Sequence, residues 1–304
     1  MCSGIKTLRK KFLLPIFSVK VSKNNLCYHE VVIEEFKVAV VIASHNRKIK
    51  TESCLKALLL AVPDQWQLKI FLVDDGSTDG TLEAILKMNL NLQVIQGSGD
   101  WYWSRSMEMG QLSIKEHFDA QLWLNDDVLL LDGALSTFDI FRKTHLNSIL
   151  VGQMRATDEF KLTYGGVVKK GRHPFRFSYV LAESSPSLVD TFDGNCVFIP
   201  NSVTSLIGNI DGKFSHAYGD YDFGLRAKML GVKCLVLPAY MGVCDQNPQL
   251  KYKNIIDRTK FIFSLKGRPL SSQVRFAKRH GGIEWPIYVF TPHIKTIFNF
   301  HVKS

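Results

Sequence analysis

Two pairs of adjacent carboxylates follow apolar runs in the sequence, and carboxylates placed in this way can bind ligands. Asp74 and Asp75 come after the run 70–73, and Asp126 and Asp127 come after the run 122–124. Ligands of open α/β sheets bind outside the carboxyl ends of the strands, so both pairs are expected to face a ligand. Adjacent carboxylates repel each other unless a cation or donors lie beside them, and Mg²⁺ is typically held by one or two carboxylates plus substrate phosphates. The second pair therefore favours a metal–diphosphate site over a solvated turn, whereas the first also fits an ordinary capped turn.

Asp220 and Asp222 lie in the first turn of a helix predicted over residues 218–230. Carboxylates at this position stabilise a helix through its dipole, which is a purely structural role. A carboxylate held at a rigid helix start can also act as a general base. Without the rest of the chain, the structural role is the favoured interpretation.

A loop rich in aromatic residues begins at Gly99 and contains Trp101, Trp103 and Arg105. Clustered aromatic residues usually belong to the core. Because the successive rings of Trp101-Tyr102-Trp103 alternate between two faces after a glycine loop, at least one ring is expected to reach the rim of a cleft. Aromatic faces and a guanidinium at that rim can stack on a base or a sugar ring.

The elements that would position these residues alternate between strands and helices. Apolar, β-branched runs predict strands at 38–43, 68–73, 92–95 and 121–124, and helical patterns separate them at 51–62, 78–87 and 103–117. Such alternation predicts a parallel sheet with right-handed crossovers. Residues 151–193 favour hairpins and loops, and they precede a strand at 196–200, helices at 202–207 and 218–230, and a strand at 233–237. From residue 251 onward the chain is predicted to be helical, basic and aromatic.

Composition indicates a folded protein with one large core, because 46% of the 304 residues are hydrophobic and 22% are charged. The net charge of +10 is concentrated in residues 6–20 and 251–303, which suits anionic partners. The six cysteines contain no Cys-x-x-Cys pair, so we expect neither a zinc site nor a redox motif, but reduced thiols in a cytosolic protein. The apolar run 11–19 is short and broken by proline, so no signal peptide is predicted and the catalytic body is expected to be soluble.

Four motifs together resemble the family-two inverting glycosyltransferases of the GT-A type, over about residues 38–245. The motifs are Ala43-Ser44-His45-Asn46-Arg47, Val73-Asp74-Asp75-Gly76-Ser77, Asn125-Asp126-Asp127 and Gly219-Asp220-Tyr221-Asp222. The resemblance implies an α/β fold, with a Rossmann-like, mostly parallel sheet flanked by helices and a helical, basic C-terminal extension. It implies an N-terminal extension at 1–36, a catalytic domain at 37–250 divided near residue 131 into nucleotide and acceptor halves, and a C-terminal segment at 251–304. The segments 99–103 and 214–227 look most like bacterial rhamnosyltransferase-like enzymes that build surface polysaccharide.

The resemblance also implies the reaction and the donor site. A sugar would pass from a nucleoside-diphosphate sugar to a hydroxyl of a glycan or lipid-linked acceptor, with inversion and with Mg²⁺ or Mn²⁺ as cofactor. Asp75 would meet the base, with Asp74 as the less favoured substitute. Asp126 would contact the ribose, and Asp127 would bind the metal. The nucleotide pocket would also contain Ser44, Asn46 and Arg47.

On the acceptor side, the resemblance implies that Asp220 is the catalytic base and that Asp222 helps to hold the acceptor or the helix. Gly194 and Asn195 would face the acceptor, and Trp101, Trp103 and Arg105 are the donor or acceptor contacts expected from the aromatic loop.

The sequence departs from the family pattern at two positions. Asn125 stands where many relatives have Asp, and Gly219 stands where an acid often precedes the base. A third metal ligand has no obvious counterpart, and Cys244 and Asp245 are only candidates for it.

Two other functions fit parts of the sequence. A sugar-phosphate nucleotidyltransferase also uses paired acids, but it should carry a glycine-rich, lysine-bearing loop after the first strand, and residues 43–48 contain no glycine. A non-catalytic sugar-binding module of the same fold would not need both Asp127 and Asp220.

The C-terminal residues 275–303 alternate basic side chains with aromatic ones. One interpretation is an interfacial segment that holds a cytoplasmic enzyme on the anionic inner face of the membrane. The other is a pair of helices packed on the catalytic domain with a solvated basic side. Nucleic acid is not an expected partner, because no recognised binding motif accompanies the charge.

Overall fold

A computed structural model describes residues 17–22, 25–30, 35–215, 217–246 and 269–298. The chain forms two compact units, residues 1–35 and 36–304. In the first unit, β1 (Phe17–Ser22) pairs with β2 (Asn25–Glu30) as an antiparallel hairpin. None of the helices in the described ranges is long and apolar enough to cross a membrane.

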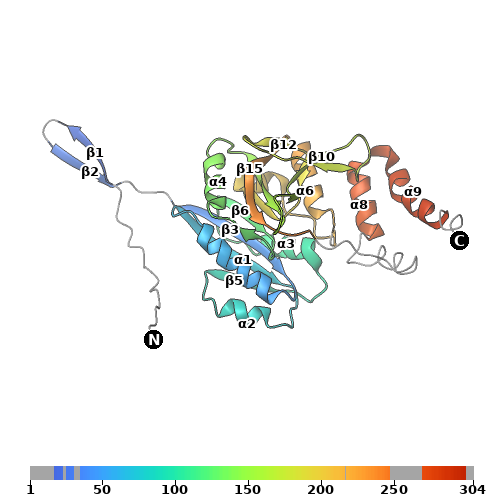
Figure 1. Ribbon diagram of the computed structural model, residues 1–304, viewed down its shortest axis with the longest axis horizontal. Helices are drawn as coiled ribbons and strands as arrows, with labels where there is room; N and C mark the ends of the chain where they lie inside the picture. Colours follow the sequence, from blue (N-terminus) through green and yellow to red (C-terminus); the bar gives the residue numbers. More distant parts are fainter. Residues whose placement is uncertain (1–16, 23–24, 31–34, 216, 247–268, 299–304) are drawn as a thin grey trace. The chain divides into compact units, whose positions relative to one another are not determined.

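The second unit is built on a ten-stranded mixed sheet (Figure 1). One half of the sheet is parallel, in the order β6 (Ala120–Leu124), β3 (Phe36–Ser44), β4 (Trp66–Asp74) and β5 (Leu92–Gln96). Beyond β6 the order continues with β14 (Cys196–Pro200), β8 (Ser148–Arg155), β15 (Lys233–Val243) and β12 (Ser187–Val189). The short strands β7 (Leu129–Leu130) and β9 (Leu162–Tyr164) pair with β15 and β8. The α/β fold with a mostly parallel sheet is therefore confirmed, with β14 inserted antiparallel between β6 and β8.

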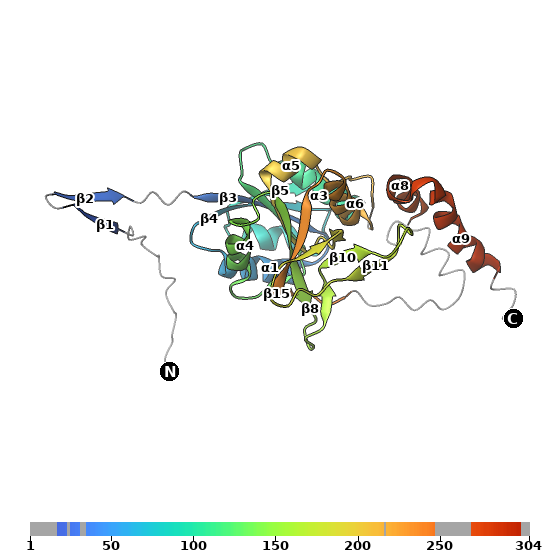
Figure 2. The same cartoon turned by 90° about the horizontal axis from the view of Figure 1, so that it is seen from above.

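Helices cover both faces of this sheet (Figure 2). One face carries α1 (Lys48–Ala61), α2 (Thr81–Leu86) and α4 (Ala134–Arg142). The other carries α3 (Tyr102–Leu112), α5 (Asn201–Ile207) and α6 (Gly219–Met229). Successive side chains of a strand point to opposite faces, so Val40 packs with Leu55 of α1, whereas Val41 packs with Met107 of α3. This double burial explains why the predicted strands are continuous apolar runs.

The predicted hairpin region contains a separate three-stranded antiparallel sheet. Its order is β11 (Phe177–Tyr179), β10 (Gly166–Lys169) and β13 (Thr191–Phe192). The described part of the C-terminal segment is helical, as expected, with α8 (Leu270–His280), the 3₁₀ turn η1 (Gly282–Glu284) and α9 (Trp285–Phe298). Residues 251–268, which were also expected to be helical, lie outside the described residues.

Three helices differ from the prediction. Helix α2 begins at Thr81 rather than at residue 78, because Gly80 has φ +82° and is left-handed. The carboxylate of Asp79 accepts hydrogen bonds from the N–H groups of Thr81 and Lys48, both at 3.0 Å. It therefore caps the first residues of both α2 and α1. Helix α3 ends at Leu112 rather than near residue 117. Helix α4 was not predicted, because nine residues leave little helical period to detect.

Candidate active site

A cavity of about 830 Å³ opens at the carboxyl ends of β3, β4 and β6. It is lined by residues from both halves of the second unit, including Asp127 after β6 and Asp220 on α6. Of the site residues predicted from sequence, nine line the cavity: Ser44, Arg47, Asp75, Trp103, Asp126, Asp127, Gly194, Asn195 and Asp220. Asn46, Asp74, Trp101, Arg105 and Asp222 do not line it.

The carboxylates of Asp126 and Asp127 are joined by one guanidinium. Arg47 Nη1 donates to Asp126 Oδ1 at 3.0 Å and to Asp127 Oδ2 at 2.8 Å. Lys50 Nζ lies 3.8 Å from the same oxygen of Asp127. Burial raises the pKa of Asp126 to about 6, against the opposing charge of Arg47. The repulsion expected between adjacent carboxylates is thus relieved by cations that the protein itself supplies.

Whether a divalent metal fits beside Asp127 depends on how many of its ligands must come from the protein. The described residues contain no group of three or more His, Cys, Asp or Glu side chains that could hold a metal ion. Cys244 Sγ lies 3.5 Å from Asp127 Oδ1, and burial raises the pKa of this thiol to about 12. The carboxylate of Asp245 instead accepts two hydrogen bonds from Thr157, from the N–H at 2.8 Å and from the hydroxyl at 2.7 Å. The donor set therefore fits an ion that is held by one or two carboxylates and completed by substrate phosphates.

Asp75 organises the loop between β5 and α3. Its Oδ1 accepts the N–H of Gly99 at 2.8 Å, and its Oδ2 accepts the N–H groups of Trp101 and Tyr102, both at 3.0 Å. A Cβ on Gly97 would lie 2.5 Å from Asp75 Oδ1, so the loop requires glycine there. Trp101 thus takes part through its backbone, although its side chain was the predicted contact.

The loops after β3 and β4 are tied to each other. Asn46, with φ +51°, donates its N–H to Ser77 Oγ at 2.9 Å and accepts the N–H of Thr78 at 2.8 Å. Asp74 accepts the N–H of Ser77 at 3.2 Å. Asn46 and Asp74 therefore stabilise the loops at the rim of the cavity without lining it. Ser44 does line the cavity, and its hydroxyl shares a hydrogen bond with the hydroxyl of Thr51 at 2.8 Å.

Asp220 is held by backbone donors at the start of α6. Gly194 N–H donates to its Oδ2 at 3.0 Å, and Tyr221 N–H donates to its Oδ1 at 2.8 Å. One edge of the side chain is open to the cavity, yet most of its surroundings are protein, and this burial raises its pKa to about 6. A Cβ on Gly194 would lie 2.5 Å from the ring of Trp103, so glycine is needed for the loop to reach Asp220. Trp103 in turn donates from Nε1 to Asn125 Oδ1 at 2.7 Å.

The structure places Asp222 and Arg105 away from the cavity. Asp222 is fully buried and accepts hydrogen bonds from Arg226 Nε at 2.9 Å, Arg279 Nη1 at 2.6 Å and His280 Nε2 at 2.9 Å. Burial opposes its ionisation, but these hydrogen bonds outweigh burial and lower its pKa. Asp222 therefore joins α6 to α8, which is the helix-holding role of the two that the sequence suggested. Arg105 forms an ion pair with Glu108 on the surface.

Four residues that line the cavity were missed by the sequence analysis. They are Tyr102, Ser106, Tyr164 and Asp193. Tyr102 directly follows the predicted Trp101, and Asp193 directly precedes the predicted Gly194. The sequence could have indicated these two residues only because each is next to a predicted site residue. Tyr164 ends a three-residue strand, where no motif marks it.

Comparison with known proteins identifies the first half of this site. Residues 39–162 match the model of the family described as Glycosyl transferase family 2. This stretch of the chain is therefore similar to a glycosyl transferase family 2 domain. The matched residues include Asp75, Asp126 and Asp127, whereas Asp193 and Asp220 lie beyond them. No curated protein matches the chain.

Solved glycosyltransferase structures share the fold of this domain. TarS residues 1–349 from S. aureus is 15% identical, with 87% of this chain and 72% of that chain covered and a TM-score of 0.57. GalNAc-T7 with UDP, GalNAc and Mn²⁺ is 13% identical, with 88% and 52% covered and a TM-score of 0.66. The mannosyltransferase PcManGT from Pyrobaculum calidifontis, in complex with GDP-Man and Mn²⁺, is 15% identical, with 88% and 71% covered and a TM-score of 0.53. The chain thus spans about half the length of the GalNAc-T7 chain. The GT-A fold that the glycosyl transferase motifs implied is confirmed.

Proposed function

We propose that the protein is an inverting, metal-dependent glycosyltransferase. It moves a sugar from a nucleoside-diphosphate sugar to a hydroxyl of a glycan or lipid-linked acceptor, in the synthesis of a bacterial surface polysaccharide by rhamnosyltransferase-like chemistry. The observation that carries this proposal is that Asp127 and Asp220, from distant parts of the chain, line one cavity of a glycosyl transferase domain.

The donor half of the proposed site lies around β3 and β6. In this proposal Asp75 would meet the base and Asp126 the ribose. Arg47 and Lys50, which lie beside the acids after β6, would offer positive charge to the phosphates. Asp127 would hold Mg²⁺ or Mn²⁺, which when bound stabilises the charge of the departing diphosphate as a Lewis acid. Support comes from structures of the same fold that contain UDP-GlcNAc, or GDP-Man with Mn²⁺.

The acceptor half of the proposed site is centred on Asp220. An acceptor oxygen attacks the anomeric carbon from the face opposite the diphosphate, so the new C–O bond forms as the bond to the diphosphate oxygen breaks. The hydroxyl proton passes to the Asp220 carboxylate. Two of the roughly four lone-pair sites of this carboxylate are taken by backbone N–H groups, which leaves room for that proton.

We expect the rate of transfer to fall at acidic pH with a midpoint of about 6. Burial favours the neutral form of Asp220 and raises its pKa to about 6, and only the ionised form accepts a proton. The rate should therefore be constant above this pKa and decrease about tenfold per pH unit below it. Initial rates of nucleoside-diphosphate release across pH test this, with nucleotide affinity measured in parallel because Asp126 titrates in the same range. A midpoint near 4, as for an ordinary exposed carboxyl, would contradict the assignment.

A donor screen tests the proposed function itself. The full chain is incubated with UDP-, dTDP- and GDP-sugars and Mn²⁺, and release of each nucleoside diphosphate is followed. Release from one donor class supports the proposal. Release of pyrophosphate from a nucleoside triphosphate and a sugar phosphate would instead indicate a nucleotidyltransferase, and binding of a donor without release would indicate a non-catalytic module.

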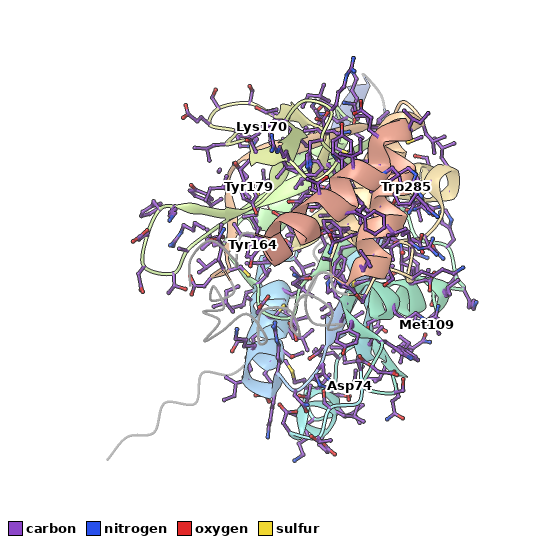
Figure 3. All side chains as sticks on the ribbon, turned by 90° about the vertical axis from the view of Figure 1, so that its right-hand side faces the viewer. Asp74, Met109, Tyr164, Lys170, Tyr179 and Trp285 are labelled. Atoms are coloured by element: carbon purple, nitrogen blue, oxygen red, sulfur yellow. The ribbon has the colours of Figure 1, made fainter. Side chains whose placement is uncertain are left out.

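We further propose that the enzyme lies on an anionic membrane surface through η1 and α9. The apolar side chains of Ile283, Ile287 and Phe290 are 95%, 62% and 43% exposed there. The β10–β11 hairpin carries the exposed cations Lys170 and Arg172. Figure 3 looks onto the side of the molecule that carries α9 and labels Lys170 of this hairpin. Contact between the rings of His173 and Tyr288, with centroids 4.7 Å apart, joins this hairpin to α9.

Substitution of Ile283, Ile287 and Phe290 together by Ser is expected to abolish flotation with vesicles that contain phosphatidylglycerol. Apolar burial and cation attraction both contribute to interfacial binding, so neutral vesicles should float less of the wild-type protein. Donor turnover in solution serves as the control for folding. Wild-type protein that does not float with anionic vesicles would exclude the membrane proposal.

A further inference from the structure

A second carboxylate, Asp193, lies in the cavity wall next to Asp220. Two hydrogen bonds link the segments that carry the two acids. Gly194, which directly follows Asp193, donates its N–H to Asp220 Oδ2 at 3.0 Å. Tyr221, which directly follows Asp220, donates its hydroxyl to Asp193 Oδ1 at 3.2 Å. Both acids line the same cavity, and the proposed transfer reaction uses only Asp220.

Asp193 is oriented by three donors from different elements. Gly165 N–H donates to its Oδ2 at 3.2 Å, and hydroxyls of Tyr221 and Tyr179 donate to the carboxylate as well. Tyr179, labelled in Figure 3, comes from β11, whereas Tyr221 comes from α6. A carboxylate offers about four lone-pair sites, so one site of Asp193 is left for a ligand in the cavity. Its side chain is only partly buried, which is consistent with such access.

Among the described residues, the two acids are not balanced by an ion pair. In the part of the chain that the structure describes, no lysine, arginine or histidine forms an ion pair with Asp193 or Asp220, in contrast to Asp127, which pairs with Arg47. Burial and the charge of Asp220 raise the pKa of Asp193 to about 7. A phosphate entering this end of the cavity would meet negative charge, whereas neutral hydroxyls would meet hydrogen-bond acceptors.

We propose that Asp193 binds a second hydroxyl of the acceptor, adjacent to the hydroxyl that Asp220 deprotonates. The acceptor is then a sugar unit with two neighbouring free hydroxyls, not an isolated alcohol or a phosphate. Aromatic rings of Trp103 and Tyr164 line the same cavity and offer faces on which a sugar ring packs. This inference rests on the proposed glycosyl transfer. Asp193 itself takes no proton in the reaction, and its contribution is to bind and orient the acceptor.

Substitution Asp193→Asn tests the inference with methyl glycosides of glucose, galactose and rhamnose as acceptor probes. We expect the acceptor KM to rise about 10- to 100-fold, as for loss of a hydrogen bond to a charged group, with a smaller change in kcat. Slow hydrolysis of the donor without acceptor should change less than transfer does, because hydrolysis needs no hydrogen bond between Asp193 and an acceptor. Asp220→Asn should lose both hydrolysis and transfer. Asp190→Asn is the matched control, since Asp190 faces Lys169 and Lys228 outside the cavity.

Deoxy acceptors identify the hydroxyl that Asp193 binds. For the best methyl glycoside, the monodeoxy analogue that lacks the neighbouring hydroxyl should be a poor acceptor for the wild type, and Asp193→Asn should make it no worse. Such non-additivity marks a direct interaction between the two groups. Tyr221→Phe should raise the acceptor KM in the same direction, whereas Tyr240→Phe, whose hydroxyl meets the Phe160 carbonyl, should not.

The outcomes separate this inference from the function on which it rests. An active wild type with an unchanged acceptor KM in Asp193→Asn, or with strictly additive effects of the deoxy acceptor and the substitution, would overturn only the role of Asp193. A wild type that releases no nucleoside diphosphate from any donor overturns the proposed transferase, and the inference falls with it.

Discussion

Asp220→Asn is expected to lower the rate of sugar transfer by about 10²- to 10⁴-fold while nucleotide affinity stays nearly constant. The amide cannot accept the acceptor proton. Its size matches the carboxylate, and its single oxygen can keep the hydrogen bond from Gly194 N–H, whereas the one from Tyr221 N–H is lost. The proposed nucleotide contacts come from the ends of β3, β4 and β6, which do not depend on this side chain. Transfer is measured by nucleoside-diphosphate release, and affinity by calorimetric titration with the nucleotide.

A matched exchange at the surface serves as the control for Asp220→Asn. Asp211→Asn removes an acid that pairs with Arg275 and Arg279 outside the cavity, so transfer should stay near the wild-type rate. Loss of nucleotide binding in Asp220→Asn, or transfer at the wild-type rate, would refute the role of general base.

Asp127→Asn should lower transfer by at least about 10²-fold and remove its response to Mn²⁺. A metal contributes several kcal/mol to stabilisation of the departing diphosphate, and each 1.36 kcal/mol corresponds to about tenfold in rate. The substitution also leaves Arg47 with Asp126 alone, since its guanidinium bridges both acids at 3.0 and 2.8 Å. Rates are measured against Mn²⁺ concentration, and nucleotide affinity is measured with and without Mn²⁺. The wild type should bind more tightly with the metal, and the variant should not.

The exposed Asp132, which follows the same strand region, provides the control for Asp127. Asp132→Asn should retain the full response to Mn²⁺. If Asp127→Asn keeps that response as well, the metal is bound elsewhere or is not used, and the assignment of Asp127 fails.

The strands and their carboxyl-terminal motifs could be predicted because each depends on a short stretch of sequence. Strand β14 has the predicted bounds, 196–200, and β3, β4 and β6 extend the predicted runs by only a few residues. A strand buried on both faces must be apolar at nearly every position, which makes it visible in a single sequence. The acids that follow such strands could therefore be placed at one edge of the sheet.

The partners of these acids could not be predicted in the same way. Asp75 receives three backbone N–H groups from the loop 99–102, and Asp222 meets residues of α8 that lie 57 and 58 positions further along the chain. Contacts between such distant residues leave no periodic pattern in the local sequence. The sequence therefore suggested ligand-binding roles for both acids. In the folded chain Asp75 also holds a loop in place, and Asp222 holds α8 in place instead.

The amino-acid sequence by itself determined that this chain forms an α/β sheet with acids at the ends of its strands, because side-chain alternation and apolar runs act over a few residues. The GT-A type followed from the resemblance of its motifs. Only the tertiary structure decided which acids share a cavity and what surrounds each of them. Asp193 and Asp220 become neighbours because β13 and the start of α6 pack together, with Thr191 Oγ1 donating to the Tyr221 carbonyl at 2.9 Å. Burial and neighbouring charge, which set the protonation of both acids, exist only once those distant segments have met.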